Sequence, residues 1–341
     1  MYHLKTIPQD FIVKEISNAN LHDKGRHRGQ YAYFTLRKIN CTTIDALQIL
    51  SKRFKVPLKN IGFAGNKDKN AVTEQKISIK SVKKFTSKAN FLSSPIKLEY
   101  LGNGKEPISL GDLEGNEFTI TVRNLEGSEV KNFQSLEPKK IRIVNFFGPQ
   151  RFSKNNNLVG KHIIKKDFKK AAGLILENKG AVENKINDYL AKNKNDYAGA
   201  IRIIPLKTRK LFVHSFQSFL FNKIIGEFLS EGMGRIKNMK APIIGFDFEL
   251  DCVKNKKLKG IINDVLAEEK ISPRDFIIRQ MPELSSQGSM RDLFFSLKDF
   301  KILEIKEDDL NENRQKIKLG FILPKSCYAT VAVAQLFNKK L

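Results

Sequence analysis

The chain has 341 residues, of which 41% are hydrophobic and 28% are charged. This mixture can bury a core and excludes a disordered chain, and the length predicts about two domains. Lys and Arg number 61 against 36 Asp and Glu, which gives a formal net charge of +25. So basic a chain most often meets a nucleic acid, although a general lysine bias of the surface is the alternative. Because the positive residues are spread along the sequence, they favour a broad basic face over a charged tail.

Other classes of protein are not expected. No run of about 18 apolar residues is present, so we expect no transmembrane helix, and the first residues lack the apolar region of a secretory signal. The three cysteines stand far apart without a Cys-x-x-Cys pair, which favours a reducing cytoplasm. His22 and His27 lie close together, but no cysteine or acidic cluster accompanies them, so we expect no metal site. No heptad seam appears, and we therefore expect a monomer.

The first 150 residues predict an α+β arrangement. Residues 9–16 alternate with the period of a strand, and residues 30–38 alternate again and should pair with them. A helix is expected over 42–54, with Thr42 or Thr43 as its N-cap. Further strands are expected at 60–65, 75–82, 116–125 and 140–148. Runs of strands with one early helix predict a mixed, mostly antiparallel sheet flanked by helices, not a βαβ array.

The composition and hydrophobic pattern of the sequence change near Ser153. An Asn- and Lys-rich stretch with helical spacing follows, and residues 211–232 predict one long helix with a wide apolar arc. Residues 241–300 are interpreted as short strands and turns. The tail returns to a strand at 316–324 and a last helix at 329–340.

The segment 62–75, GFAGNKDKNAVTEQ, carries two glycines and a carboxylate between lysines. It lacks the G-x-x-x-x-G-K-[ST] spacing of a P-loop. Its Asn-Lys-Asp-Lys run resembles the guanine-specifying motif of GTPases, but the aspartate stands one position early, so a GTPase is not expected. Asp68 either bonds nearby backbone N–H groups in an Asx-turn or serves as a reactive carboxylate, a nucleophile or a base. The neighbours Lys67 and Lys69 favour its charged form.

These residues resemble the signature loop of the TruD family of tRNA pseudouridine synthases, A-G-x-K-D-(K/R)-x-A-V-T-x-Q, in which the aspartate is catalytic. Asp68 matches that aspartate. The likeness continues in order in KTIPQDFIVKE, GNEFTITVR, NFFGPQRF, HSFQSFLFN and LPKSCYATV, which together span essentially the whole chain. The sequence departs from the pattern at Gln9, Phe146, Ser153 and Ser326-Cys327, and two of these departures put serine where the family has glycine, which narrows the allowed backbone conformations.

The resemblance implies a pseudouridine-synthase core over residues 1–152 and 300–341, with an inserted α/β TRUD domain over 153–299. It implies that a uridine of tRNA, position 13 in archetypal bacterial members, is isomerised to pseudouridine without a metal, nucleotide or redox cofactor. The partner expected is tRNA. The alternative is a non-catalytic RNA-binding module, which would keep the basic face and would not need Asp68.

The resemblance also implies which residues meet the target uridine: Phe11, Asn116 and Tyr328. An extruded base needs an aromatic face to stack on, and Asn offers a donor and an acceptor to the edge of uracil. For Phe11, ordinary core packing is the equal alternative, and for Phe118 the core is favoured.

The charged and polar candidates have more than one role open to them. Lys5 is expected to reach either a phosphate or the catalytic carboxylate. Lys67 is expected to hold the loop or a phosphate, with a solvated side chain that has no such role as the equal alternative. Gln150 and Arg151 are expected either to form a network under the loop or to anchor RNA phosphate.

Overall fold

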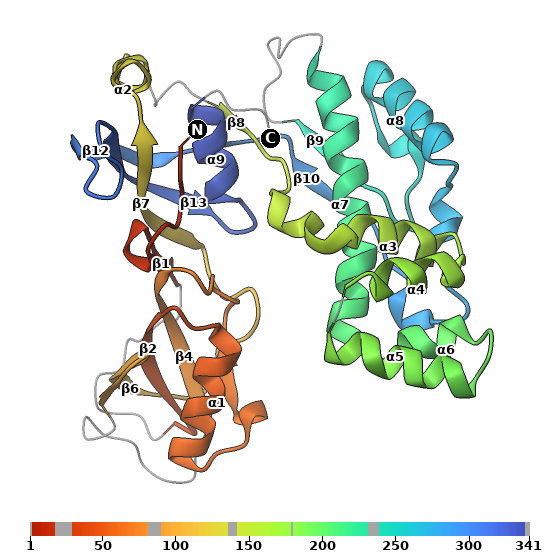
Figure 1. The fold of residues 1–341 in the computed structure, drawn as a ribbon, viewed down its shortest axis with the longest axis horizontal. Coiled ribbons are helices and arrows are strands. Elements are labelled where there is room, and N and C mark those ends of the chain that lie inside the picture. Colours follow the sequence, from red (N-terminus) through yellow and green to blue (C-terminus); the bar gives the residue numbers. More distant parts are fainter. Residues whose placement is uncertain are drawn as a thin grey trace. The chain divides into compact units, whose positions relative to one another are not determined.

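The computed structural model describes residues 2–17, 29–80, 90–135, 142–178, 180–230 and 239–337. The chain divides into two compact units (Figure 1). The first unit comprises Met1–Ile143 and Ser296–Ala329, and the second comprises Val144–Phe295 and Thr330–Leu341. No helix among the described residues is long and apolar enough to cross a membrane.

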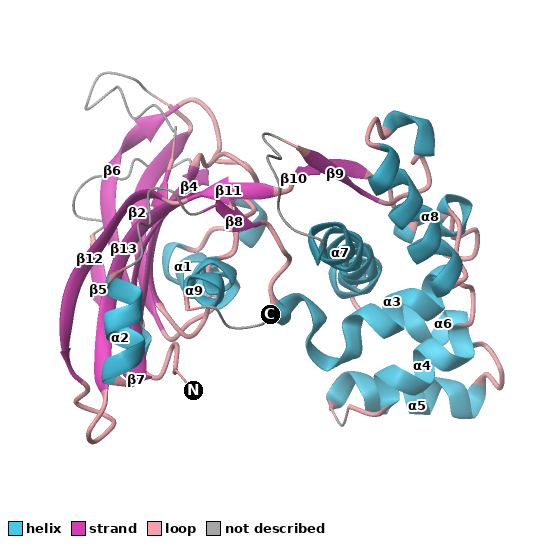
Figure 2. Cartoon of the chain, turned by 90° about the horizontal axis from the view of Figure 1, so that it is seen from above, coloured by secondary structure: helices cyan, strands magenta, loops and turns pink. Residues whose placement is uncertain are grey.

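A mixed sheet of nine strands forms the frame of the first unit (Figure 2). In spatial order the strands are β12 (Lys298–Glu307), β13 (Gln315–Pro324), β7 (Gly115–Leu125), β1 (Phe11–Ile16), β4 (Val72–Lys80), β2 (Tyr31–Ile39), β6 (Ile96–Gly104) and β5 (Phe91–Ser93). β3 (Ile61–Phe63) pairs with the far end of β4. β1 and β4 run parallel, whereas the other described pairs of this sheet are antiparallel. The expected α+β fold with a mixed, mostly antiparallel sheet is thus confirmed.

The expected pairing of the first two strands is wrong. β4 lies between β1 and β2, and it hydrogen-bonds β1 along Val72–Glu74 and β2 along its whole length. Alternation in a sequence identifies a strand but not its partner, and here a parallel neighbour far along the chain takes the place of the sequential one.

Helix α1 (Thr43–Phe54) packs on one face of this sheet. Its N-cap is Thr42, whose hydroxyl accepts a hydrogen bond from the Asp45 N–H, and it ends at Lys55 in the left-handed conformation. Its buried side chains join those of β2, β3, β4 and β6 in one cluster, which includes Ala46, Leu47, Leu50, Phe34, Leu36, Ile77 and Ile79. A second helix of the first unit, α2 (Gly127–Gln134), follows β7.

The second unit is mainly helical. Its helices are α3 (Asn156–Ile164), α4 (Phe168–Leu176), α5 (Ala181–Lys192), α6 (Tyr197–Arg202), α7 (Leu206–Ser230) and α8 (Lys256–Glu269), and β9 (Lys240–Ile243) pairs with β10 (Ser289–Asp292). The short strands β8 (Arg142–Val144) and β11 (Phe294–Ser296) pair where the chain passes from one unit to the other, and α9 (Ala329–Leu336) is the last helix.

The long helix expected at 211–232 is confirmed as α7, but the interpretation of 241–300 as strands and turns is wrong for α8. Asn255 caps α8 by accepting a hydrogen bond from the Leu258 N–H. Leu258, Ile262 and Val265 are buried along one stripe of the helix. This buried stripe outweighs the low helix propensity of the β-branched residues and of Gly260 within α8.

Candidate active site

The centre of the sheet brings several of the candidate residues to one face. In the antiparallel register of β1 and β7, Phe11 lies opposite Ile120, and Glu15 lies opposite Asn116. Phe118, two residues after Asn116, is on the same side because directly opposed and alternate residues share a face. Phe11, Glu15, Asn116 and Phe118 therefore form part of one surface at the middle of the first unit.

Residues 64–71, which we call the aspartate loop, connect β3 to β4. Thr43, at the start of α1, accepts a hydrogen bond from the Lys67 N–H at 2.9 Å and donates one to the Gln75 side chain at 3.1 Å. Gln75 in turn donates to the Gly65 carbonyl at 3.1 Å. Helix α1 and strand β4 thereby hold the backbone of the loop just before Asp68.

Asp68 is not buried in a closed turn. Its side chain is 39% exposed, and its Oδ2 atom lies 3.1 Å from the Nζ atom of Lys5. Among the described residues no hydrogen bond joins this carboxylate to a backbone N–H of its own loop, so the Asx-turn alternative has no support. The ammonium of Lys5 also lies 4.1 Å from the centre of the Phe11 ring. Lys5 therefore meets the carboxylate, which was one of its two expected contacts.

A buried cluster of charges fixes the N-terminal segment that carries Lys5. Arg123 on β7 donates to Asp10 at 2.8 Å and to Asp308 at 2.6 Å, and its backbone exchanges two hydrogen bonds with His3. Burial alone would lower the pKa of Arg123, but hydrogen bonds to Asp309, Asp10 and Asp308 raise it above its ordinary value. The guanidinium stays charged and anchors Asp10, after Lys5, while the backbone of Arg123 anchors His3, before Lys5.

The ammonium of Lys67 pairs with Glu15 and not with Asp68, its neighbour in the sequence. Its Nζ atom lies 2.5 Å from Oε2 of Glu15 on β1, and the two side chains are only 6% and 0% exposed. Glu15 also accepts a hydrogen bond from the Lys76 N–H at 3.3 Å. These contacts support the expectation that Lys67 holds the loop, and its contact with a phosphate stays a prediction.

Lys38 on β2 is a residue of this site that the sequence analysis missed. Its side chain is fully buried, and its Nζ atom donates to the carbonyls of Cys41 and Asp68, each at 2.7 Å, and more weakly to that of Lys67 at 3.4 Å. The signal was present in the sequence, because Lys38 continues the alternating apolar face of Ala32, Phe34 and Leu36.

The expected contacts with the uridine come from side chains of different character. Phe11 is buried, with its ring 6.0 Å from that of Phe118, and Phe118 stacks on Phe321 at 5.7 Å. Both phenylalanines therefore serve the core, as favoured for Phe118. Asn116 differs, because its Oδ1 atom is buried without a hydrogen-bond partner among the described residues. Tyr328 is half-buried in the first unit, shortly after the end of β13.

Gln150 and Arg151 belong to the second unit. Gln150 is exposed. Arg151 donates from Nε to the Ser218 hydroxyl of α7 at 3.2 Å, and its carbonyl accepts a hydrogen bond from Ser215 at 2.8 Å. Arg151 is therefore fixed against α7, and a role for it in RNA binding stays a prediction. Asn222 of α7 also pairs with both backbone groups of Phe147, within the same unit.

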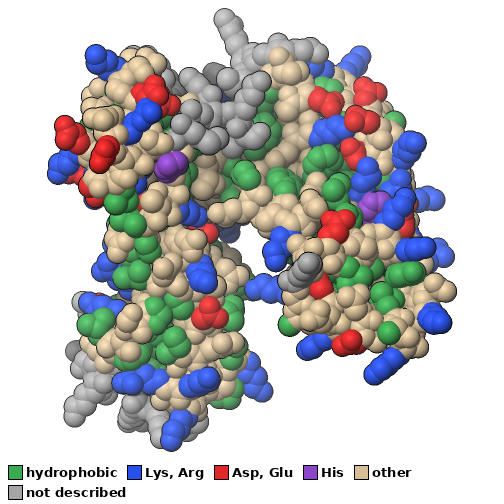
Figure 3. All heavy atoms as spheres, in the orientation of Figure 1, with side chains coloured by type: hydrophobic (Ala, Val, Ile, Leu, Met, Phe, Trp, Pro, Cys, Tyr) green, Lys and Arg blue, Asp and Glu red, His purple; other side chains and the backbone are tan. Residues whose placement is uncertain are grey.

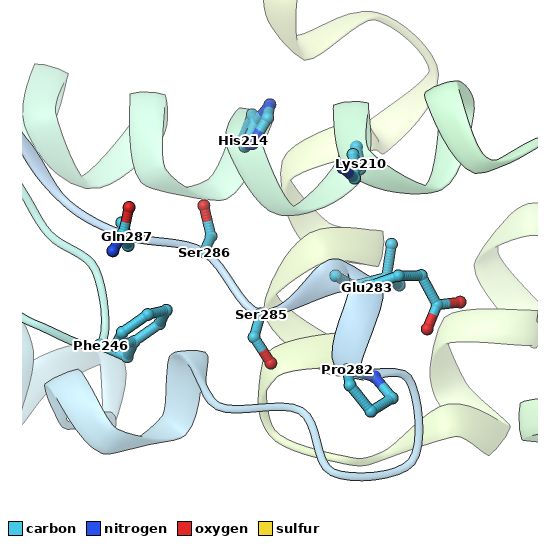
Figure 4. Close-up of a pocket in the computed structure, with 9 residues that line it drawn as sticks. Lys210, His214, Phe246, Pro282, Glu283, Ser285, Ser286 and Gln287 are labelled. Carbon is cyan, nitrogen blue, oxygen red and sulfur yellow. The ribbon is translucent and has the colours of Figure 1, made fainter.

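The second unit also carries an open cavity of about 550 Å³ (Figure 4). Lys210 and His214 line it from successive turns of α7, with Phe246 and Gln287 on the other side. Neighbouring protein atoms displace water from His214 and lower its pKa, and the cations Arg151 and Lys210 lower it further. The cavity thus offers a cation and an aromatic ring, which are groups that contact phosphates and bases in RNA.

Lys and Arg side chains are spread over the visible face of both units, with fewer Asp and Glu side chains among them (Figure 3). His22 and His27 lie outside the described residues. Within the described residues, no group of three or more His, Cys, Asp or Glu side chains is placed to hold a metal ion.

The comparisons with known proteins agree along the whole chain. The family model described as "tRNA pseudouridine synthase D (TruD)" matches residues 2–187, 176–238 and 233–336. The chain belongs to the TruD family. Its TruD relatives include the tRNA pseudouridine synthase D of Aquifex aeolicus, which is 28% identical over 98% of this chain and 97% of the relative.

A TruD relative from Methanosarcina mazei, described as a probable tRNA pseudouridine synthase D, is 30% identical over 96% of this chain and 91% of its own length. The crystal structure of a TruD protein from Methanosarcina mazei superposes with a TM-score of 0.73 at 28% identity, covering 98% of this chain and 93% of that one. As a TruD member, the chain is a tRNA pseudouridine synthase, which is an isomerase.

Proposed function

We propose that the chain isomerises uridine 13 of tRNA and that Asp68 is its catalytic residue. In this reaction the N1–C1′ bond of the uridine breaks, the uracil turns, and C5 bonds to C1′; the C5 proton is released and N1 ends protonated. The observation that carries the proposal is the half-exposed Asp68 carboxylate, held between Lys5 and the buried supports of the aspartate loop. Asp68 acts either as the nucleophile at C1′ or as a base.

The contacts of the other candidate residues support further roles at the site. Asn116 has a buried oxygen that no described residue hydrogen-bonds, and the N3–H group of a flipped uracil would satisfy it. Tyr328 offers an aromatic surface near the start of β7, because β13, which precedes it, ends beside Gly115. Phe11 supports the base from beneath through the core that it shares with Phe118.

We also propose that Lys5, Lys67, Gln150 and Arg151 assist the binding of RNA, and that residues 1–152 with 300–341 form the catalytic core while 153–299 form the inserted TRUD domain. The protein is proposed to work as a cytoplasmic monomer. The high positive charge supports a polyanionic substrate, and the family supports tRNA.

The test is release of tritium from tRNA labelled at C5 of uridine, because C5 loses its hydrogen when it bonds to C1′. The wild type should release tritium, Asp68→Ala should release none above background, and Glu99→Gln, which changes an exposed carboxylate of β6, should behave as the wild type. Turnover by Asp68→Ala would remove the catalytic assignment. A wild type that binds tRNA without turnover would be the non-catalytic RNA-binding module instead. Carbodiimide mapping of the product tests position 13.

A further inference from the structure

Lys38 is a buried cation on a face of β2 that otherwise carries apolar side chains. Its neighbours on that face, Ala32, Phe34 and Leu36, belong to the core cluster under α1. Among the described residues it forms no ion pair with a carboxylate; backbone carbonyls alone receive its hydrogen bonds. Burying an ammonium without a carboxylate partner on an apolar face costs free energy of folding. The presence of Lys38 there therefore indicates a specific task.

The number of donors on Lys38 equals the number of acceptors around it. An ammonium carries three N–H groups, and the carbonyls of Cys41, Asp68 and Lys67 accept them at 2.7, 2.7 and 3.4 Å. The Lys67 and Asp68 carbonyls belong to the two peptide groups that flank the Cα atom of Asp68. One side chain therefore constrains the backbone on both sides of the residue that carries the carboxylate.

We propose that Lys38 is a positioning residue of the isomerase: its ammonium fixes the backbone at Asp68, so that the carboxylate is held in the geometry needed for reaction. This inference rests on the proposed catalytic role of Asp68. Thr43 and Gln75 hold the loop before Asp68, and Lys38 alone of these three bonds the carbonyl of Asp68 itself. The loop geometry at the reacting group therefore depends on Lys38 more than on the other two.

Protonation of Lys38 gives the proposal a pH signature. Burial lowers its pKa to about 8; Cys41 and Asp68 nearby oppose this lowering, and Lys67 adds to it. The neutral amine has one N–H fewer, so at least one of the three carbonyls loses its donor above that pH. Loosening of the aspartate loop removes two of these carbonyls but leaves Lys38 on the buried face of β2, unlike global unfolding, which returns it to water. The neutral amine therefore favours the loosened loop, and we expect the loop to loosen, and kcat to fall, as the pH rises through about 8.

Three variants and the wild type test this. Lys38→Met keeps an unbranched side chain of nearly the same length and removes the donors. It should lower kcat about 100-fold while KM changes less than about threefold, because misplacement by about 1 Å costs this much. Lys38→Arg keeps a cation at every pH, and its kcat should not show the fall near pH 8. Lys97→Met, an exposed lysine of β6, should match the wild type in both respects.

The proposal is overturned if folded Lys38→Met, checked by far-UV circular dichroism, retains kcat within about threefold of the wild type. Should either variant fail to fold, the wild type decides: hydrogen exchange of the amides in the aspartate loop should lose protection between about pH 7 and pH 9, relative to the amides of α1. Unchanged relative protection also overturns the proposal. A wild type without tritium release refutes the proposed function instead, and the hydrogen-exchange result still reports on Lys38.

Discussion

The buried ion pair between Glu15 and Lys67 should prove strongly coupled, because it attaches the aspartate loop to β1. The two charged atoms lie 2.5 Å apart, and the side chains are 0% and 6% exposed. Removing one partner leaves the other charge buried and unpaired, so Glu15→Gln and Lys67→Met should each lower the free energy of unfolding by about 3–5 kcal/mol. The double variant leaves no charge behind and should lose less than the sum, which gives a coupling of at least about 2 kcal/mol.

Urea unfolding of the wild type, both single variants and the double variant measures that coupling directly. The matched control is the pair of Glu304 and Lys306 on β12, whose side chains are 35% and 65% exposed, and it should show a coupling below about 1 kcal/mol because solvent screens it. Additive effects of Glu15→Gln and Lys67→Met would contradict the reasoning. Each single variant should also lower kcat in the tritium assay, since the loop loses its attachment to the strand that carries Phe11.

Four other outcomes are expected. The free energy of unfolding of the wild type, relative to Lys38→Met, should rise by about 1.4 kcal/mol per pH unit between the folded pKa of about 8 and the ordinary value of 10.5, because there the unfolded chain binds the extra proton; urea unfolding at several pH values measures this. Arg123→Met should lower the free energy of unfolding by about 3–5 kcal/mol, since Asp10 and Asp308 would remain buried without their cation, and equal urea midpoints would contradict this. Asn116→Ala should reduce kcat/KM about 10- to 100-fold and change the free energy of unfolding by less than about 0.5 kcal/mol, because within the described part of the chain its oxygen has no hydrogen bond to lose. Lys210→Ala should reduce the slope of log Kd for tRNA against log salt by about 0.7–0.9, the value for one phosphate contact, and an unchanged slope would remove that contact.

Local patterns in the sequence predict much of the fold. Alternation identifies β1 and β2, and the Thr42 cap and the helical spacing after it identify α1 within a residue of its observed start. The pairing of the strands could not be predicted from these patterns. The parallel partner of β1 is β4, which follows only after β2, α1 and β3, and period-two alternation carries no information about such a partner.

The sequence likewise predicts some parts of the candidate site and not others. The motif of residues 62–75 singles out Asp68, but the contact with Lys5 joins residues far apart in the chain and depends on where Arg123 holds the N-terminal segment. Lys38 is the more instructive omission. Its place on the apolar face of β2 could be read from the alternation, but its three acceptors are backbone carbonyls, which no side-chain pattern reveals.

The order of synthesis matters for β7. Its partner β13 (Gln315–Pro324) is encoded after all of residues 144–295, so the ribosome completes the second unit's main segment before this pairing can form. Until then β7 lacks one neighbour and the stacking of Phe321 on Phe118. An unpaired strand edge is a template for intermolecular association. Premature termination before Gln315 should therefore yield an aggregating fragment, even though every residue from the aspartate loop to β7 has already been translated.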